Sequence, residues 1–358
     1  MQQAPRRARA TISHAIRAIL RAVPRFLDPS GTKFWEITRT GAVVARRSGS
    51  VGKAGRSLEQ RYPNALLARW HYRNMVGRKT HSERYRPDPD DRDAPPPAAA
   101  APPPDDPAEL LVYADWLQTQ GDPRGELIAL QQAGNHRAAG ELLERAAAQL
   151  LGEAAEAREL FAATWERGFV RELAIGHSER DPAHRRWLAA MRALLPDVPA
   201  CYLHGVLLET LFASPSLGQL RDIVIGSAGT ADFQDTMLAL CARAPATLRR
   251  VVIAADSSRE GFLATLTLPG VEEFACDLRL AAAAVAQIAE ATWPRLRRLA
   301  IFAPDPELAL TELLRTRLIE QLERLAIRTP LAVGPALVDE VRRRAPALAL
   351  DLRQRARP

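Results

Sequence analysis

Cysteine and aromatic residues are scarce in this 358-residue chain, and it contains no long apolar run. The three cysteines lie far apart, so the sequence holds neither a disulfide framework nor a paired-cysteine zinc motif. Aromatic residues make up only 6% of the chain, which leaves Leu, Ile, Val and Ala to build the core. No segment approaches the roughly 18 apolar residues that a membrane-spanning helix needs. We therefore expect a reduced, cytoplasmic protein with two or three domains.

Catalytic motifs are missing as well. The sequence has no HExxH zinc-protease motif, no GxSxG nucleophile motif and no complete phosphate-binding loop. The segment SVGKAGRS around Lys53 resembles a phosphate loop only superficially, because its glycine context and the strand ahead of it do not fit. Cys201 lies near three histidines in sequence, but its apolar position favours a core residue over a nucleophile or metal ligand. We expect no enzymatic activity, no metal site and no cofactor.

Charge is distributed unevenly along the chain. Residues 1–86 carry 19 Lys and Arg against 4 Asp and Glu, a net charge of +15, whereas the remaining residues have a net charge of −8. A basic head on an acidic body suggests nucleic acid or another polyanion as a partner. The preference for Arg over Lys is typical of a GC-rich genome, but codon bias does not explain why acids are missing from one end.

Nine of the 27 prolines fall in residues 87–107. Proline fixes φ and removes a backbone donor, so this segment predicts an extended spacer between two folded parts. Residues 1–30 are basic and amphipathic, and we expect a solvated extension there, with attachment to a membrane surface as the alternative.

After the spacer the pattern becomes helical. Asp106 and Pro107 are typical of an N-cap and a first helical residue, and Asp122 with Pro123 repeats that pair. We expect four helices, at residues 108–120, 124–132, 137–151 and 154–166. Tyr113 and Trp116 lie three apart on the first helix, and both are expected to pack against the helices that follow.

From residue 170 onward an apolar-x-x-apolar-x-apolar pattern recurs. It occurs eight times, starting at Val170, Val198, Leu220, Leu248, Val271, Leu296, Leu322 and Ala345, with a mean step of 25 residues. That step falls inside the period of about 20–29 residues that is typical of leucine-rich repeats. Each unit predicts one short strand facing a shared core, followed by a helical or turn return. Residues 170–358 are therefore expected to form an α/β solenoid; a two-layer α/β alternation without repeats is the alternative.

The outward residues of these units form a candidate protein-binding surface. A small, mildly apolar stripe flanked by mixed charge suits a protein better than nucleic acid, although the same face could pack on residues 105–169. The candidate residues are Glu172, Tyr202, Asp222, Val224, Arg250, Val252, Glu273, Arg298 and Arg324.

Residues 31–86 resemble a WGR domain. The resemblance rests on the strand KFWEI at Lys33, the glycine spacing at Gly49, Gly52 and Gly55, a helix at 65–76, and a closing Lys79 and Tyr85. Ser48 and Ser50 stand where that family has its name-giving Trp and Arg. The family is associated with DNA ends, which here implies non-specific phosphate contacts rather than end recognition; a solvated basic surface without a partner is the alternative. The candidate contacts are Arg46, Arg47, Lys53, Arg56, Arg73, Arg78 and Lys79.

Two further resemblances follow. The motifs LVYADWL and GDPRGE within residues 105–132 closely resemble the bacterial repeat-companion domain, and Trp165 and Gly168 continue that match into the repeats. The units from 170 are similar to divergent leucine-rich repeats that lack the usual asparagine. Together these features resemble bacterial WGR-plus-repeat proteins sometimes labelled molybdate-metabolism regulators, a resemblance that brings no defined reaction.

The sequence thus predicts an α/β protein in five parts. These are a basic extension (1–30), a WGR-like α+β domain (31–86), a Pro/Ala-rich linker (87–107), a helical companion domain (108–169) and a leucine-rich-repeat-like solenoid (170–358). The predicted function is a non-catalytic adaptor that binds an unknown protein through the repeat face. The alternative is a regulator that binds nucleic acid through residues 31–86.

Overall fold

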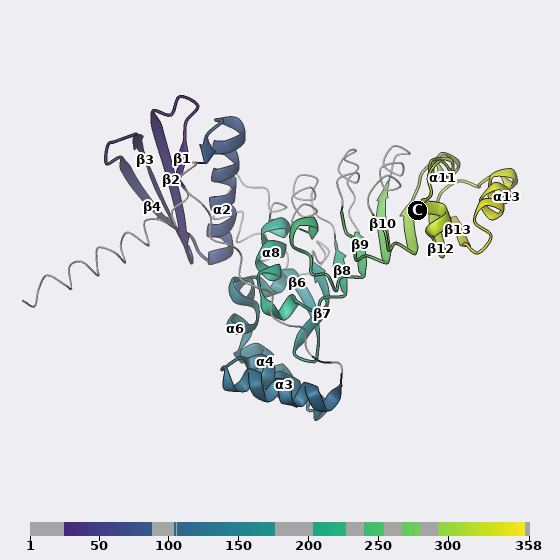
Figure 1. The fold of residues 1–358 in the computed structure, drawn as a ribbon, viewed down its shortest axis with the longest axis horizontal. Coiled ribbons are helices and arrows are strands. Elements are labelled where there is room, and N and C mark those ends of the chain that lie inside the picture. Colours follow the sequence, from purple (N-terminus) through teal and green to yellow (C-terminus); the bar gives the residue numbers. More distant parts are fainter. Residues whose placement is uncertain are drawn as a thin grey trace, which may run out of the picture. The chain divides into compact units, whose positions relative to one another are not determined.

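The computed structural model describes residues 25–87, 104, 106–175, 203–226, 240–253, 267–279 and 293–354. The chain divides into two compact units, residues 1–98 and 99–358, and each unit is built on one sheet (Figure 1). The mixed α/β class expected from the sequence is therefore confirmed. Within the described ranges, no helix has the length and apolar character needed to cross a membrane.

The first unit is an antiparallel sheet with a helix on one face. Its strand order is β4-β3-β2-β1-β5, and helix α2 (Ala65–Gly77), capped by Asn64, packs against β2 and β3. A π-helical turn, η1 (Arg78–Ser82), continues α2. The strands are β1 (Arg25–Leu27), β2 (Lys33–Thr40), β3 (Val43–Ser50), β4 (Arg56–Arg61) and β5 (Arg86–Pro87).

The sheet starts ahead of the boundary predicted at residue 31. Phe26 on β1 is aligned with Trp35 on β2, their ring centroids lie 5.4 Å apart, and both side chains are buried. The predicted helix at 65–76 and strand at Lys33 are present.

Close packing explains part of the glycine spacing in this unit. The turn between β3 and β4 folds against the ring of Phe34. A Cβ atom on Gly49 would lie 2.7 Å from the Cα of Gly55, and one on Gly55 would lie 2.6 Å from Cζ of Phe34. Gly55 also has a φ of +73°, which L side chains rarely adopt. A larger residue at either position would push the turn away from the ring.

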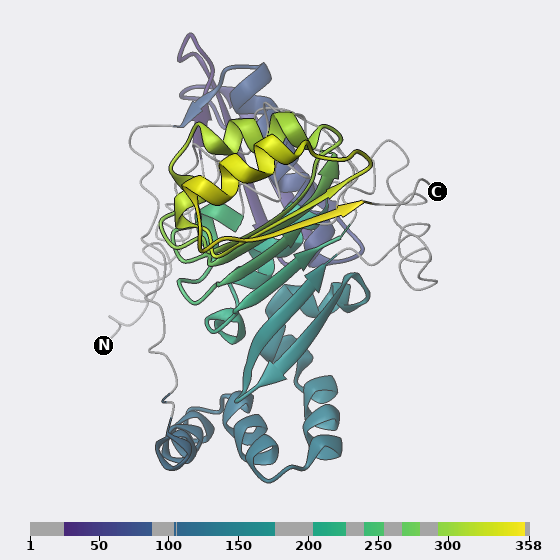
Figure 2. The same ribbon diagram turned by 90° about the vertical axis from the view of Figure 1, so that its right-hand side faces the viewer.

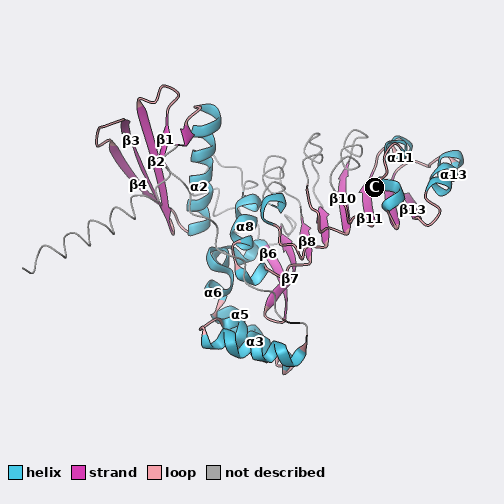
Figure 3. Ribbon diagram, viewed as in Figure 1, coloured by secondary structure: helices cyan, strands magenta, loops and turns pink. Residues whose placement is uncertain are grey.

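The second unit contains an eight-stranded sheet in the order β13-β12-β11-β10-β9-β8-β7-β6 (Figures 2 and 3). From β7 to β13 every neighbouring pair is parallel, and the strands follow each other in chain order. The strands are β6 (Phe161–Glu166), β7 (Phe169–Ile175), β8 (Asp222–Ile225), β9 (Arg250–Ile253), β10 (Glu273–Arg279), β11 (Arg298–Phe302), β12 (Arg324–Thr329) and β13 (Ala349–Gln354).

The middle apolar residues of the predicted units line up across this sheet on its buried side. Each of them on β7 to β12 is at most 1% exposed; they are Leu173, Ile223, Val251, Phe274, Leu299 and Leu325. Helices α11 (Pro306–Leu314) and α13 (Pro335–Arg344) pack together and lie on one side of the last strands (Figure 2). The shorter helix α12 (Leu318–Gln321) lies between them in the chain. Among the described residues, no helix lies on the opposite side of these last strands, which we call the open side of the sheet.

Two of the eight predicted units differ from the structure. Val198 and Cys201 lie outside the described residues, but Leu203 begins helix α8 (Leu203–Phe212) and β7 pairs directly with β8. No strand of that unit therefore lies between its predicted neighbours. The last unit is displaced by two residues, because Leu350 rather than Leu348 is aligned with Leu325.

The predicted helix at 154–166 is wrong over its second half. A 3-10 helix, η2 (Gly152–Leu160), is followed by strand β6, which pairs antiparallel with β7. Arg167 and Gly168, with φ of 52° and 78°, form the two-residue turn of this hairpin. The alanine-rich sequence favours a helix locally, but the hairpin lets β6 extend the buried face of the sheet.

Helices α3 (Pro107–Thr119) and α4 (Pro123–Gln132) begin where the predicted caps place them. The predicted helix at 137–151 is divided at Ala146 into α5 (His136–Arg145) and α6 (Ala147–Leu151). Asp106 accepts hydrogen bonds from the backbone of Ala108 and Glu109. Trp116 does not pack as expected: it is 54% exposed and stacks on Tyr113, with ring centroids 5.6 Å apart.

Arginine side chains connect consecutive strand units. Arg171 Nη1 donates to the carbonyl of Gln219 at 3.2 Å, and Arg249 Nη1 donates to the carbonyl of Gly270 at 3.3 Å. Arg297 makes the same contact with the next unit. The first of these carbonyls, that of Gln219, lies between a short 3-10 helix, η4 (Pro215–Leu217), and β8. These hydrogen bonds satisfy turn carbonyls and fix the spacing of the strands.

Candidate functional site

The outward residues of β7 to β12 form two aligned rows on the open side of the sheet, which we call the outer face. The first row is Glu172, Asp222, Arg250, Glu273, Arg298 and Arg324, and the second is Ala174, Val224, Val252, Ala275, Ala300 and Ala326. Eight of the nine predicted protein-binding residues thus lie on one surface. The ninth, Tyr202, is outside the described residues.

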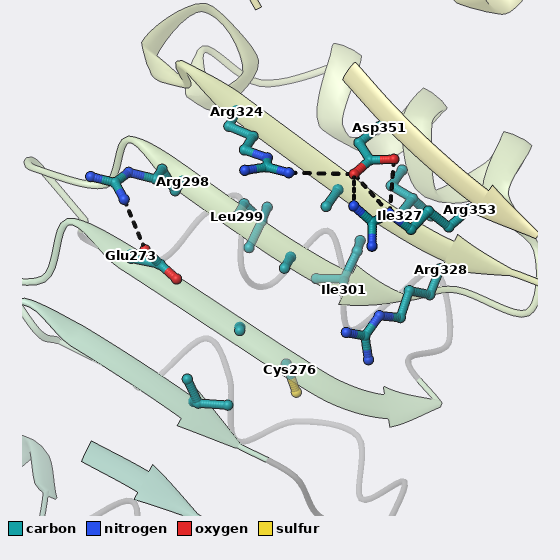
Figure 4. Close-up of a pocket in the computed structure, with 14 residues that line it drawn as sticks. Glu273, Cys276, Arg298, Leu299, Ile301, Arg324, Ile327, Arg328, Asp351 and Arg353 are labelled. Atoms are coloured by element: carbon teal, nitrogen blue, oxygen red, sulfur yellow. Dashed lines mark hydrogen bonds and ion pairs between the residues drawn. The ribbon is translucent and has the colours of Figure 1, made fainter. Parts of the chain in front are cut away.

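A groove of about 290 Å³ crosses the outer face over β9 to β13 (Figure 4). Its floor contains Ala275, Ala300 and Ala326, whose small side chains leave the backbone accessible. Arginines on either side of this alanine floor form the walls of the groove. Arg298 and Arg324 stand on one side, and Arg328 and Arg353 stand on the other. We call this feature the outer-face groove.

Each carboxylate in the groove is shared between two arginines. Glu273 Oε1 accepts from Arg250 Nε at 2.8 Å, and its Oε2 accepts from Arg298 Nη1 at 3.2 Å. Asp351 forms ion pairs with Arg353 at 2.9 Å and Arg324 at 3.5 Å. The hydrogen bond from Arg353 lowers the pKa of the Asp351 carboxyl. Guanidinium N–H donors therefore outnumber carboxylate acceptors here.

The other end of the outer face has the opposite charge. Glu172 on β7 and Asp222 on β8 are neighbours in the first row. Burial raises the pKa of Asp222, and the nearby charges of Glu172 and Glu273 raise it further against the opposing effect of Arg250. The face is thus acidic over β7 and β8 and basic over β11 to β13.

The first unit has its own groove of about 690 Å³, on the side of the sheet that carries α2. No acidic residue is among the residues that line it, and we call it the basic groove. Its cations are Lys33, Arg46, Arg56, Arg78 and Lys79, and its aromatic residues are Phe34, Trp35 and Tyr85. Lys79 Nζ lies 4.7 Å from the ring centroid of Tyr85. Arg46 Nη1 lies 3.4 Å from Sδ of Met75.

The basic groove collects four of the seven predicted nucleic-acid contacts: Arg46, Arg56, Arg78 and Lys79. The other three do not line it. Arg47 points to the opposite side of the sheet and donates two hydrogen bonds to Glu36, at 2.7 and 2.9 Å, which raise the pKa of its guanidinium. Lys53 lies in the exposed turn after β3, and Arg73 lies on α2.

Sequence reasoning missed Lys33, which lines the basic groove. It lies two residues before Trp35 on β2, so the alternation of a strand places both on one face. Lys79 and Arg78 share Glu83 as an ion-pair partner.

The described residues contain no group of three or more His, Cys, Asp or Glu that could hold a metal ion. Cys276 is 2% exposed on the buried side of β10. Cys241 is half-buried, and burial raises the pKa of its thiol. Cys201 lies outside the described residues.

No protein-family model matches this chain, and no curated protein matches it. Among solved structures, a Bacteroides fragilis protein from a structural genomics consortium aligns over 92% of this chain and 95% of its own. The two are 10% identical and the TM-score is 0.26, which is too low to indicate a shared fold.

Proposed function

We propose that this chain is a non-catalytic interaction protein that binds a protein partner in the outer-face groove. In this proposal residues 170–358 act as a leucine-rich-repeat-like scaffold, and residues 108–169 act as its helical companion domain. The observation that carries the proposal is the alanine floor of Ala275, Ala300 and Ala326 between two arginine rows.

Three features of this surface support a protein partner. The floor consists of alanines, whose side chains are small, so the main chain of a partner can approach the sheet closely. The walls offer donors from arginine and an acceptor from Glu273, and Asp351 offers a second acceptor at the β13 end of the floor, which suits the mixed hydrogen bonding of a polypeptide. The buried side of the sheet holds the core, so the outer face is the side available for contact.

Site-specific photo-crosslinking tests this proposal in cells. Benzoylphenylalanine in place of Ala300 on the groove floor should give a discrete adduct with a partner. The same group in place of Arg343, an exposed residue of α13, serves as the control. The adduct should disappear when Arg298→Glu and Arg324→Glu are added. Equal adducts at both positions, or none at Ala300, would refute the proposal.

A second candidate function is nucleic-acid binding by the first unit, which is favoured by the acid-free lining of the basic groove. In this reading residues 31–86 act as a WGR-like module that contacts phosphates without reading bases. The half-buried ring of Tyr85 beside Lys79 provides a surface on which a base can stack.

Two residues of strand β4 give a matched test of this function. Arg56 lines the basic groove, whereas Arg61 on the same exposed strand does not. The full chain is titrated with duplex DNA at several salt concentrations. Arg56→Glu should weaken binding and reduce the slope of log K against log salt by about 1, while Arg61→Glu should change it less. Equal effects of the two variants, or no binding at low salt, would remove this candidate.

A further inference from the structure

The charges of the outer-face groove identify the chemistry of its partner. We infer that the groove binds an acidic protein segment in extended conformation, which crosses the strands from β10 to β13. This inference rests on the proposed function and names the class of partner.

Cations outnumber anions in the outer-face groove. Arg250 and Arg298 share one carboxylate, Glu273, and Arg324 and Arg353 share another, Asp351. A guanidinium group has five N–H donors, and a carboxylate that is shared with a second arginine occupies only some of them. Carboxylates from a partner can therefore bind without displacing either internal acid.

The shape of the groove suits an extended segment. Ala275, Ala300 and Ala326 are aligned on adjacent parallel strands, which in sheets lie about 4.8 Å apart. A segment that lies across this floor has arginines on both sides. In an extended chain, successive side chains point in opposite directions. Acidic residues at consecutive positions would thus reach the Arg298–Arg324 wall and the Arg328–Arg353 wall in turn.

The two acids of the groove favour a peptide over a nucleic acid. Glu273 and Asp351 stand among the arginines, and they would repel the unbroken row of charges of a phosphate backbone. A peptide can instead place neutral residues or backbone N–H groups opposite these two acids. The acidic pair Glu172 and Asp222 further limits an acidic partner to the β10–β13 end of the face.

Fluorescence anisotropy with the full chain tests the inference. The probe is a labelled synthetic peptide of Glu-Glu-Ala repeats, the Glu–Ala peptide, in which consecutive Glu side chains can reach both walls. A Lys-Lys-Ala peptide of equal length, the Lys–Ala peptide, is the comparison. The Glu–Ala peptide should bind, and its affinity should fall as salt rises. In the Arg298→Glu, Arg324→Glu variant its affinity should drop about tenfold or more.

A matched variant controls for overall charge and folding. Arg342→Glu with Arg343→Glu makes the same charge change on the exposed surface of α13 and should leave affinity unchanged. Circular dichroism should report the same fold for both variants. Equal binding of the Lys–Ala peptide, equal effects of the two variants, or tighter groove-dependent binding of oligothymidylate would overturn the inference. If the Glu–Ala peptide fails to bind while the Ala300 adduct persists, this inference fails and the proposed function stands; if both are absent, both fail.

Discussion

Arg298 on β11 donates to the carboxylate of Glu273 on β10 at 3.2 Å, and the same carboxylate accepts from Arg250 on β9. One acid therefore connects three consecutive strands through side chains. Because the three residues are aligned in the sheet, this row of charges follows directly from the parallel register. Each pair is partly exposed, so the individual contribution to stability is small, about 0–1 kcal/mol. The larger effect is on recognition, since the arrangement fixes guanidinium groups along the groove.

Gly125→Ala should destabilise the second unit. A Cβ atom at Gly125 on α4 would lie 2.3 Å from the carbonyl oxygen of Ala114, so α3 and α4 would have to move apart. We expect a loss of about 1–3 kcal/mol in the free energy of unfolding, measured by urea titration. Gly140→Ala on α5 is the control, because nothing lies within 4 Å of its added Cβ. That variant should be neutral or more stable by about 0.5–1 kcal/mol. Similar losses in both variants would contradict the close approach of α3 and α4.

Asp122→Ala should cost more than loss of a helix cap alone. Asp122 caps α4 through the backbone N–H of Arg124 and forms an ion pair with the guanidinium of Arg124, a residue only 5% exposed. Its loss leaves a buried charge without its partner, and we expect about 2–4 kcal/mol. Asp106→Ala removes the cap of α3, where the described residues form no ion pair with the capping carboxylate, and should cost about 1 kcal/mol in the same urea titration.

The same pair predicts an acid dependence. Burial alone would raise the pKa of Asp122, but the hydrogen bonds and charge of Arg124 outweigh burial and lower it. A carboxyl with a lowered pKa in the folded state stabilises above its unfolded pKa of about 3.9, and this contribution is lost as the pH falls further. The free energy of unfolding should therefore decline below about pH 4 less steeply in Asp122→Asn than in the parent chain. Parallel acid profiles would count against the ion pair.

His71 predicts a second pH dependence, in the first unit. Burial lowers the pKa of His71, and the charges of Arg46 and Arg78 lower it further. The unfolded chain therefore binds a proton more readily below about pH 6.5, so stability is full above that pH and is lost as the pH falls. His71→Phe, which can keep the ring contact with Tyr62, should reduce this loss between about pH 7 and 5. Urea unfolding across that range measures it, and an unchanged pH profile would contradict it.

Trp116 should be the most readily quenched tryptophan among those in the described ranges. Trp116 is 54% exposed, whereas Trp165 is half-buried and Trp35, Trp70 and Trp293 are at most 8% exposed. Trp116→Phe should therefore remove a large part of the acrylamide-quenchable fluorescence of the native chain. Trp293→Phe, at a buried position, should remove little of it. The reverse order would show that α3 is covered on its outward side.

The sequence predicted the strands best where the apolar spacing has a single solution. The residues Leu299 and Ile301, with a polar position ahead of them, allow only one register. At the C-terminal end leucines alternate at positions 348, 350 and 352, so two registers fit the spacing, and the predicted register is the wrong one. In the unit predicted from Val198, Leu203 begins helix α8 instead of ending a strand.

Other features needed information that one sequence does not carry. Helix α3 has apolar residues on two sides, so periodicity alone could not show that Leu117 is buried while Trp116 is exposed. Predicting the basic groove of the first unit requires knowing which strand residues share a face of the sheet. Arg46 and Arg47 are neighbours in sequence, yet only Arg46 lines the basic groove.

Methyl NMR tests the central claim most directly. The full chain, with its alanine methyl groups labelled, is titrated with the Glu–Ala peptide. We expect the methyl resonances of Ala275, Ala300 and Ala326 in the outer-face groove to shift. The resonance of Ala174, which lies in the same row on β7, should not shift. Shifts at Ala174 equal to those at Ala300, or a spectrum that does not change over the groove, would contradict the central claim.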